Sequence, residues 1–422
     1  MKSYNLIVVG GGFAGVAAAI SAGRAGLSVL LIEKANCLGG AATNCLVNPF
    51  MPNHTPVEVN GEKRDIHLSQ GLYKEILEEL GHFKAATSGW APAFHEEYLK
   101  IVLNRMALEA KVEILYHSYL SDIKKSGERI ESVTVVNKSG KQEFFADTFI
   151  DATGDADLAV LSGCPHRLGR EADGLCQPMT LCFRVGGVDL EKFKATRGTI
   201  NSLYQEFQAS GKIKNPRENV LIFHTLLDGV LHFNSTRIVK LNPVDAFDLT
   251  RAEIMAREQV LELFNFMKEN IDGFQNSQLL ITAAEIGVRE SRMIDGDYIL
   301  TGKDLVDCVK FDDTIAAGNY DIDIHNPEGS GTSHYYFPAG QYYTIPYRSL
   351  IPTGTDNLLV AGRCISADHE AQASIRIMPI VCTLGEAAGS AAALAVKAGG
   401  SVRKINITEL QSNLVKNGAF IK

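Results

Sequence analysis

The sequence predicts an α/β fold built on a parallel sheet, because a strand, a glycine-rich turn, a helix and a second strand follow one another at its start. Residues 4–9 form a short apolar run that glycines at residues 10–12 bring to an end. Residues 13–24 are rich in alanine and predict a helix, and the apolar residues 27–32 predict the second strand. Strand, helix and strand within about 30 residues match a βαβ unit. The start of the chain is therefore predicted to be a Rossmann-type nucleotide-binding fold.

The composition is that of a folded protein with two domains. The chain has 422 residues, and a domain usually takes roughly 100–200. Hydrophobic residues make up 45% and charged residues 21%, which excludes a mainly disordered chain. The net charge of -8 repels phosphate backbones and anionic lipid, so nucleic-acid and membrane partners are not expected.

The cysteines and the N-terminus indicate a cytoplasmic location. No two of the eight cysteines form a C-x-x-C pair, which argues against zinc ribbons, iron–sulfur clusters and a dithiol redox site. Scattered, reduced cysteines are typical of cytoplasmic proteins. The first apolar run reaches its glycines too soon for a signal peptide. No metal site is expected.

Further elements follow the first βαβ unit. Residues 35–94 are irregular and rich in proline, apart from one expected helix at 68–80, and they look like an insertion over a cofactor. The next segments predict a helix and then strands that continue the sheet as an accessory β-meander. Their ranges are 95–110 for the helix and 112–116, 129–136 and 147–152 for the strands.

The middle of the chain has a different pattern and predicts an inserted α+β domain. Between residues 164 and 336, strands such as 180–185 alternate with polar loops and one strong helix at 250–268, which Thr250 and Glu253 are predicted to open as a capping box. Nucleotide-domain patterns then return as strands at 342–350 and 358–361 and a helix at 377–397. We therefore expect a discontinuous nucleotide domain over residues 1–162 and 340–422, with a substrate domain over residues 163–339 between its two parts.

The strongest motif is Gly10-x-Gly12-x-x-Gly15, followed by Glu33 at the end of the second strand. The first glycine permits a tight turn, the second lets the backbone approach a pyrophosphate, and the third lets helix and strand pack closely. The amides of the helix N-terminus then bind the anion. Glu33 stands where a ribose hydroxyl is held and disfavours a 2′-phosphate. The motif predicts a bound dinucleotide.

Three later segments bear on which dinucleotide is bound. They read Leu-Gly-Gly-Ala-Ala-Thr at 38–43, Ala-Thr-Gly-Asp at 152–155 and Leu-Val-Ala-Gly-Arg at 359–363. The set resembles that of the FAD-dependent oxidoreductases of the glutathione-reductase-like superfamily, on the branch of the succinate dehydrogenase and fumarate reductase flavoproteins. The resemblance covers both parts of the nucleotide domain, and in the middle it depends mainly on residues 287–292.

This resemblance implies FAD as the cofactor. The first turn would hold the pyrophosphate, Glu33 the adenosine ribose, and residues 39–43 the flavin-side phosphate and the ribityl chain. A helix beginning near Gly385 would point its positive end at the flavin ring. The residues implied to bind FAD are Gly10, Gly12, Phe13, Ala14, Gly15, Glu33, Lys34, Gly39, Gly40, Ala41, Thr43, Thr153, Gly154, Asp155, Gly362, Arg363 and Gly385.

Two departures from better-known members of the superfamily limit what the resemblance implies. No histidine lies between residues 34 and 53, where a covalent flavin link would be sought, so we expect noncovalent FAD. No second strand–GxGxxG–helix unit lies between residues 160 and 340, so direct reduction by a nicotinamide nucleotide is not expected.

The candidate catalytic residues are Arg292, His334, His369 and Arg376. If residues 289–292 are helical, Arg289 and Arg292 share a face and could clamp a carboxylate, although ion-paired surface arginines have the same spacing. His369 and Arg376 flank the segment before the last long helix, where an imidazole could take the proton that accompanies hydride transfer. A lone histidine is more often structural.

The sequence therefore predicts an FAD-dependent oxidoreductase that moves a hydride between flavin and a small polar substrate, an anionic one included. One alternative keeps the fold but acts on RNA, which the acidic composition disfavours. The other binds FAD without redox turnover. The sequence leaves open the substrate, the direction of the reaction, the electron partner and the oligomeric state.

Overall fold

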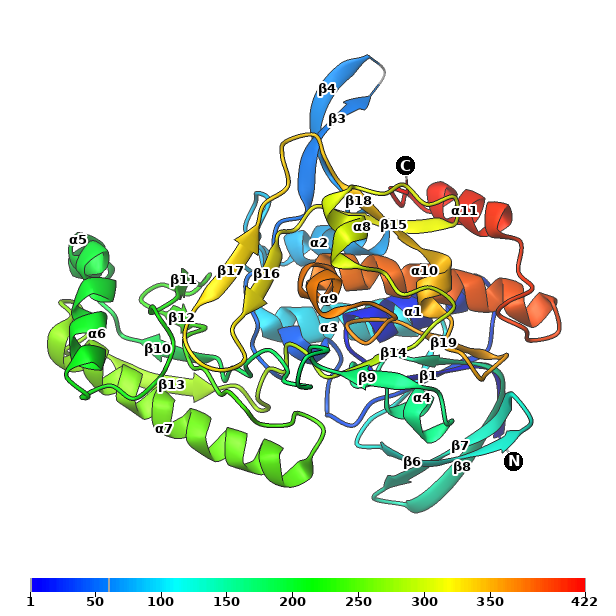
Figure 1. Ribbon diagram of the computed structural model, residues 1–422, viewed down its shortest axis with the longest axis horizontal. Coiled ribbons are helices and arrows are strands. Elements are labelled where there is room, and N and C mark those ends of the chain that lie inside the picture. The colour runs from blue at the N-terminus through cyan, green and yellow to red at the C-terminus, as the bar shows by residue number, and fades with distance from the viewer. Residues whose placement is uncertain (1, 60, 422) are drawn as a thin grey trace.

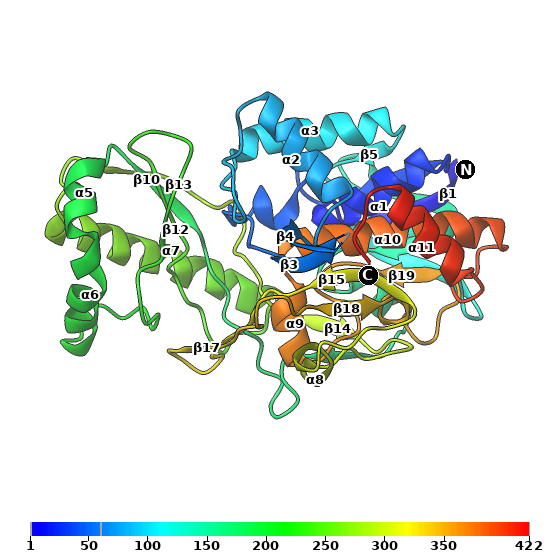
Figure 2. The same ribbon diagram turned by 90° about the horizontal axis from the view of Figure 1, so that it is seen from above.

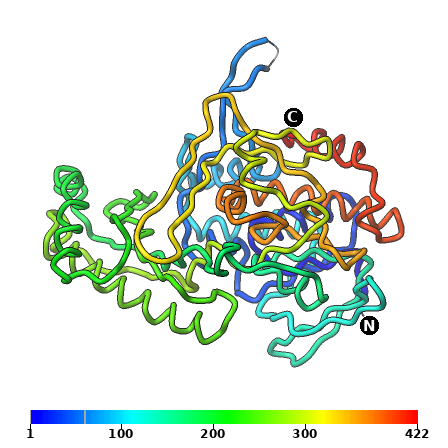
Figure 3. Tube along the Cα trace, viewed as in Figure 1, coloured from blue at the N-terminus to red at the C-terminus, as the bar shows by residue number. Residues whose placement is uncertain are grey.

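A computed structural model describes residues 2–59 and 61–421 of the chain. The molecule has a large body, on the right of Figure 1, and a smaller lobe, on the left. The trace in Figure 3 leaves the body for the lobe in the green part of the chain and returns in the yellow part. Both chain ends lie on the body. The fold is α/β, as predicted.

The body is built on a seven-stranded sheet with a parallel part and a meander. The parallel strands run in the order β5, β2, β1, β8, β19. Their bounds are Glu113–Leu115, Val29–Ile32, Lys2–Val9, Gly140–Asp151 and Leu358–Val360. The first half of β8 also pairs antiparallel with β7 (Arg129–Asn137), which pairs with β6 (Tyr119–Ser126). The accessory meander is confirmed, with β6 as a strand that the sequence did not predict.

Two small-residue helices pack against each other in the body. They are α1 (Phe13–Arg24) and α10 (Met378–Lys397). A Cβ on Gly385 would lie 2.0 Å from the carbonyl oxygen of Ala14, and one on Gly389 would lie 2.2 Å from that of Ala18. The glycines of α10 therefore permit direct helix–helix contact. The helix predicted at 377–397 is confirmed, with Pro379 as a favoured first-turn residue. The helix start near Gly385 that the resemblance implied is wrong, because Gly385 lies inside α10.

α10 also has the length and apolar composition of a membrane span. In the part of the chain that the structure describes, it is the one helix that passes this test, and 94% of its apolar window is buried inside the protein. Burial against α1 accounts for its composition, since core helices of large domains are apolar all round.

The lobe has a core of its own. A four-stranded sheet in the order β11, β12, β10, β13 packs with the helices α5, α6 and α7. The strands are Ile222–His224, Leu231–Phe233, Phe183–Gly186 and Gln278–Thr282, and the helices are Leu190–Thr196, Ile200–Ala209 and Ala246–Asn270. Hydrophobic residues from 179 to 286 fill this core, whereas those from 294 to 322 pack into the body. The domain boundaries at residues 162 and 340 stay a prediction.

The capping box expected at Thr250 and Glu253 is wrong. The helix α7 begins four residues earlier, where Asp245 accepts hydrogen bonds from the amides of Phe247 and Asp248. Thr250 donates instead to the carbonyl of Ala246, and Glu253 accepts from the amide of Ile286. An aspartate is as good a helix cap as a threonine, so the earlier cap is used.

Most of the remaining elements belong to the body (Figures 1 and 2). Among them, β16 and β17 form a hairpin between lobe and body, and β3 and β4 form a projecting hairpin that the sequence did not predict. The strands are β3 (His54–Val59), β4 (Glu62–His67), β9 (His166–Leu168), β14 (Arg292–Ile294), β15 (Thr314–Gly318), β16 (Ile322–His325), β17 (Thr332–Tyr335) and β18 (Tyr343–Pro346). The helices are α2 (Leu72–His82), α3 (Glu96–Glu109), α4 (Asp157–Leu161), α8 (Gly302–Val306), α9 (His369–Ile375) and α11 (Ile407–Lys416), with 3₁₀ turns at Gly40–Ala42, Arg197–Thr199 and Tyr347–Leu350.

Candidate cofactor and substrate site

The first glycine turn joins β1 to α1 and has one open position. Gly10 has a φ of +101°, and a Cβ there would lie 2.4 Å from the carbonyl oxygen of Ala152. A Cβ on Gly15 would lie 1.8 Å from the carbonyl oxygen of Gly10, so these two glycines permit the turn itself. A Cβ on Gly12 would meet nothing within 4 Å. Gly12 precedes the first helical residue of α1 and therefore presents open space at a helix N-terminus.

Glu33 ends β2 and points back to this turn. Its side chain accepts hydrogen bonds from the amide of Gly11 at 2.5 Å and from the amide of Ala35 at 2.7 Å. Burial raises the pKa of Glu33 above its ordinary value, and these two amides oppose that shift. The neighbouring Lys34 pairs with Glu285 at 3.0 Å, which ties the end of β2 to the lobe side of the chain.

The second glycine segment lies beside the first. Gly39 forms a parallel bridge with Gly12, and a Cβ on Gly40 would lie 2.9 Å from the Cα of Gly12. Thr43 donates to the carbonyl of Leu38 at 2.8 Å and so closes the short turn around the two glycines. The two glycine segments, which the resemblance implies bind different parts of FAD, therefore lie side by side.

The loop after β8 is held by a carboxylate that the sequence did not single out. Asp151 is fully buried and accepts from the amide and hydroxyl of Thr153 and from the amide of Ala159. Burial raises its pKa to about 6. The loop delivers Asp155, which pairs with Arg363 at 2.6 Å, and burial of Asp155 is outweighed by Arg363, so the Asp155 pKa is lowered. The sequence motifs at 153–155 and 362–363 thus meet.

Arg289 and Arg292 do not share a helix face. Residues 286–291 are irregular, and Arg292 begins β14. Arg292 donates to the carbonyl of Asp155 and pairs with Asp157, on the side of the Asp155–Arg363 pair. Arg289 points elsewhere and donates to the carbonyl of Pro178 at 2.6 Å and to Thr180 at 2.5 Å. The helical clamp expected of these two arginines is wrong because the segment is extended.

His369 begins α9 and is fixed by a carboxylate. Its Nδ1 donates to Oε1 of Glu290 at 2.7 Å, and the other oxygen of Glu290 accepts from the amide of Gln177 at 2.8 Å. Glu290 is fully buried, and the side chain of His369 is 10% exposed. Glu290 thus joins the segment before α10 to the chain that leaves the lobe and, through Gln177, to the chain that enters it.

A second group of ionisable side chains surrounds Asp323 on β16. We call it the Asp323 cluster; its members are Asp321, Asp323, His325, His334 and Arg376. Nδ1 of His334 donates to Asp321 at 2.5 Å and lies 3.7 Å from Asp323. His325 and Arg376 lie 3.3 Å and 3.6 Å from the other oxygen of Asp323. His334 and Arg376, two of the four candidate catalytic residues, are thus brought together.

The charges in the Asp323 cluster depend on burial and on two nearby arginines, Arg289 and Arg376. Burial alone would raise the pKa of Asp323, but the hydrogen bond from His325 and the nearby Arg376 hold it well below its usual range. Burial and the positive charge of Arg289 lower the pKa of His325 to about 3, so this imidazole is neutral at pH 7. Ligand atoms of Asp321, Asp323 and His334 lie within 4.8 Å of one another, a spacing that a metal ion could also use. The expectation of a metal-free site stays a prediction.

A family model for FAD dependent oxidoreductases matches residues 5–414. The chain belongs to this family. FAD is therefore its cofactor, and the protein is an oxidoreductase.

Solved structures of flavoproteins resemble this flavoenzyme over almost its whole length. A geranylgeranyl bacteriochlorophyll reductase-like protein from Thermoplasma acidophilum is 13% identical, with 99% of this chain and 85% of that chain covered and a TM-score of 0.48. A p-nitrophenol 4-monooxygenase from Pseudomonas putida is 12% identical, with 96% and 83% covered and a TM-score of 0.48. A flavin-dependent brominase is 14% identical, with 98% and 84% covered and a TM-score of 0.46. Likenesses at this level say nothing about the reaction of the flavoenzyme described here.

The residues of the first turn fit FAD. A pyrophosphate needs a helix N-terminus that the backbone leaves uncovered, and the open position at Gly12 provides one. The Asp155–Arg363 pair and the Gly39–Gly40 turn border the same edge of the sheet, because they follow β8, β19 and β2. The remaining residues assigned to FAD from the sequence keep these roles as predictions.

Asp323, His325 and Asp321 were missed in the sequence. The stretch Asp-Ile-Asp-Ile-His over residues 321–325 alternates polar and apolar side chains, which is the period of a half-buried strand. That alternation could have indicated polar groups gathered on one face. The arginines near Asp323, Arg289 and Arg376, come from distant segments of the chain, and no local sequence pattern indicates that they lie there.

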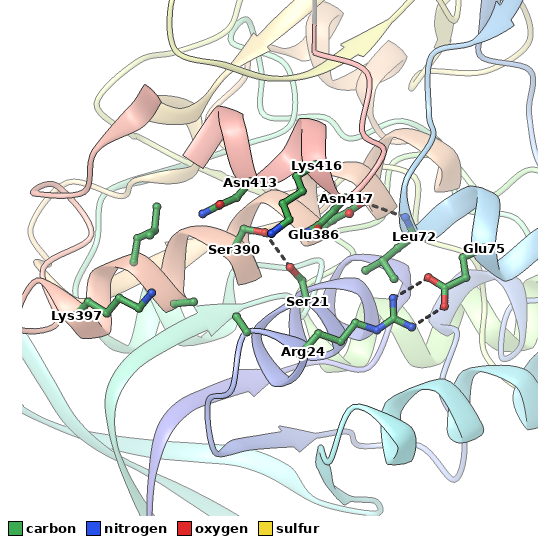
Figure 4. Close-up of a pocket in the computed structure, with 13 residues that line it drawn as sticks. Ser21, Arg24, Leu72, Glu75, Glu386, Ser390, Lys397, Asn413, Lys416 and Asn417 are labelled. Atoms are coloured by element: carbon green, nitrogen blue, oxygen red, sulfur yellow. Dashed lines mark hydrogen bonds and ion pairs between the residues drawn. The ribbon is translucent and has the colours of Figure 1, made fainter. Parts of the chain in front are cut away.

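A surface pocket lies apart from the glycine turns, between α1, α2, α10 and α11 (Figure 4). Its floor carries Glu386 of α10, whose Oε2 accepts from the amide of Leu72 at the start of α2 at 3.0 Å. Burial raises the pKa of Glu386 to about 7. Arg24 and Glu75 form an ion pair at its rim. The pocket thus contains none of the glycines assigned to FAD.

Proposed function

We propose that this flavoenzyme transfers a hydride between a small polar organic substrate and noncovalently bound FAD, with the substrate held where the body meets the lobe. FAD supplies the ability to accept or donate a hydride and to change colour as it does so. The observation that carries the proposal is the Asp323 cluster, a set of mutually oriented ionisable groups that runs from the buried Asp323 and His325 to the exposed His334, next to the start of α10. Perturbed titratable groups gathered at such a junction are typical of substrate sites.

His334 is the group best suited to exchange a proton with the substrate. Its side chain is 36% exposed, and the hydrogen bond from its Nδ1 to Asp321 orients the ring. A carboxylate in this position fixes the tautomer and leaves Nε2 as the acceptor of a substrate proton. His369 is more enclosed and bonded to Glu290, so we propose that it positions the segment before α10.

Arg376 is suited to orient the substrate. It follows α9 directly and precedes α10 by two residues, and its guanidinium donates to the backbone carbonyl of Asp323 at 3.0 Å. That hydrogen bond fixes one edge of the planar guanidinium group of Arg376. Arginine in a fixed orientation binds carboxylates with two parallel hydrogen bonds. Arg292 forms an ion pair with Asp157 instead. Among the four candidate catalytic residues, it has the least structural support for a contact with the substrate.

The proposal is tested by anaerobic reduction of the purified, flavin-loaded protein. A panel of small alcohols, amines and carboxylic acids is mixed with the protein while the visible spectrum is recorded. The proposal expects one of these compounds to bleach the flavin without any other reductant. Bleaching only by nicotinamide nucleotides would overturn it, as would binding of RNA with no change in the flavin spectrum after any compound.

A further inference from the structure

Four arginines gather beside the Asp323 cluster, and they differ in how completely they are paired. We call Arg217, Arg237, Arg289 and Arg376 the arginine cluster. Their charges reach one another, since Arg217, Arg237 and Arg376 all act on the pKa of Arg289. Three of the four come from chain segments that enter, form or leave the lobe.

Arg237 holds the hairpin with both terminal nitrogens of its guanidinium, and among the described residues only its buried Nε has no hydrogen-bond partner. Its guanidinium donates to the carbonyls of Gly329 and Gly331, to Nδ1 of His325 at 3.0 Å and to Thr332 at 3.0 Å. It also pairs with Glu218 at 3.3 Å. Arg237 is 1% exposed and anchors the β16–β17 turn to the lobe. Its role is structural.

Arg217 is buried but almost unpaired. It is 4% exposed, and within the described residues its side chain makes one hydrogen bond, a long contact from Nε to Asn219 at 3.4 Å. Within residues 2–59 and 61–421, its buried Nη1 finds no hydrogen-bond partner. Burial lowers the pKa of Arg217, with Glu218 and Asp323 opposing the shift. Burying a guanidinium nitrogen without a hydrogen-bond partner costs free energy, so the retention of Arg217 at this position needs a reason.

Arg289 has neutral partners where a charged one would be expected. It donates to the carbonyl of Pro178, to Thr180 and, at 3.4 Å, to the amide oxygen of Asn234. Burial, together with the charges of Arg376 and Arg217, lowers its pKa to about 9. Arg237 pairs with Glu218 and Arg376 with Asp323, whereas Arg217 and Arg289 form no ion pair within the described residues. Four guanidinium groups thus lie near three carboxylates, those of Glu218, Asp323 and Asp321. Positive charge is therefore in excess inside the junction.

We propose that Arg217 and Arg289 form the binding site for the anionic group of the substrate, a carboxylate or phosphate bound between lobe and body. The excess of positive charge and the unpartnered nitrogen of Arg217 are what such an oxyanion would satisfy. Arg376 and His334 then lie on the body side of the same group of charges. The inference deepens the proposed function by naming the substrate class, and oxyanion binding can be measured without turnover.

The test is isothermal titration of the flavin-loaded protein with sodium malonate and with sodium phosphate, against sodium chloride at equal ionic strength. We expect saturable binding of malonate or phosphate, and the two arms distinguish the anion. Arg217→Met and Arg289→Met should each weaken that binding by about 10–100-fold, because a charged hydrogen-bonding partner is lost. Arg257→Ala, which removes an exposed arginine of α7 paired with Glu253, is the matched control and should bind as wild type does.

Thermal unfolding separates a ligand site from a structural role. If Arg217 binds an anion, Arg217→Met should not lower the unfolding temperature in chloride. Malonate or phosphate should raise the unfolding temperature of the wild type but not that of the variant. No saturable binding of either anion would overturn the inference, as would wild-type binding in both variants or a large loss of stability for Arg217→Met in chloride. Binding without flavin bleaching by any compound would leave the anion site standing and contradict the proposed hydride transfer alone.

Discussion

Arg376 donates to the backbone carbonyl of Asp323 at 3.0 Å, and its guanidinium lies 3.6 Å from the carboxylate of the same residue. The contact joins the segment before α10 to the hairpin β16–β17, which lies between body and lobe in Figure 1. Arg376 thus links the start of α10, the helix expected to lie near the flavin, to β16, the strand that carries Asp323.

His334→Ala and Arg376→Ala should keep their flavin but lose substrate-driven reduction. Neither residue belongs to the glycine turns, so the visible spectrum should equal that of the wild type. Loss of a general base costs about 100-fold or more in the rate of reduction. Anaerobic stopped-flow absorbance measures both quantities on one sample. Arg64→Ala, which removes an exposed arginine of β4 paired with Glu62, is the control; equal rates in all three variants would remove both residues from the reaction.

Gly12→Val should abolish FAD binding while the protein stays folded. The open space at Gly12 accepts a side chain, and its φ of -68° suits any residue, so the loss comes from blocking the pyrophosphate. Gly81→Val is the matched control, because Gly81 also meets nothing within 4 Å but lies in α2. The flavin-to-protein absorbance ratio after gel filtration measures the effect. Full flavin in the Gly12 variant would require another pyrophosphate site.

Glu33→Ala should weaken FAD binding less than Gly12→Val does. The variant loses one predicted ribose contact and leaves the amides of Gly11 and Ala35 without their carboxylate. We expect a cost of about 1–3 kcal/mol in FAD affinity. Glu33→Gln keeps an acceptor for one amide and should bind FAD more tightly than Glu33→Ala and less tightly than the wild type. Titration of apoprotein with FAD, followed by fluorescence quenching, checks the order of the three variants.

Glu386→Gln should flatten the dependence of stability on pH. Burial raises the pKa of Glu386 from 4.5 to about 7 in the folded protein, so the native state holds its proton more tightly than the unfolded state does. The stabilisation is complete below pH 4.5 and is lost as pH rises through about 7, by up to about 3 kcal/mol. Unfolding in urea at several pH values measures this. Glu78→Gln, at an exposed carboxylate of α2, should follow the wild-type curve; a Glu386→Gln variant that also follows it would contradict the prediction.

The local parts of the fold were predictable because local patterns determine them. The glycines at 10, 12 and 15 predict the first turn, and in the structure β1 ends directly before this turn and α1 begins within it. The start of α7 was misjudged because Asp245 and Thr250 are both acceptable caps, and only packing decides between them. The periodicity over 377–397 predicts α10 to within one residue, whereas the helix start near Gly385 that the resemblance implied is wrong because Gly385 lies in a helix–helix contact.

The substrate side was largely beyond the sequence. His334 and Arg376 were singled out, but the carboxylate that relates them, Asp323, was not. Arg217 and Arg289 stand out because they are enclosed by the protein without an ion-pair partner among the described residues. Only the tertiary structure shows these properties. Arg292 was expected beside Arg289 on a helix, yet the chain is extended there and sends it to Asp157.

The measurement that tests the central claim most directly is the visible spectrum of the flavin-loaded protein mixed anaerobically with small organic oxyanions. The claim predicts that one of them bleaches the flavin completely with no other reductant present, yielding one oxidised product molecule for each flavin reduced. The claim is contradicted if the flavin stays oxidised with every such compound and bleaches only when a nicotinamide nucleotide is added.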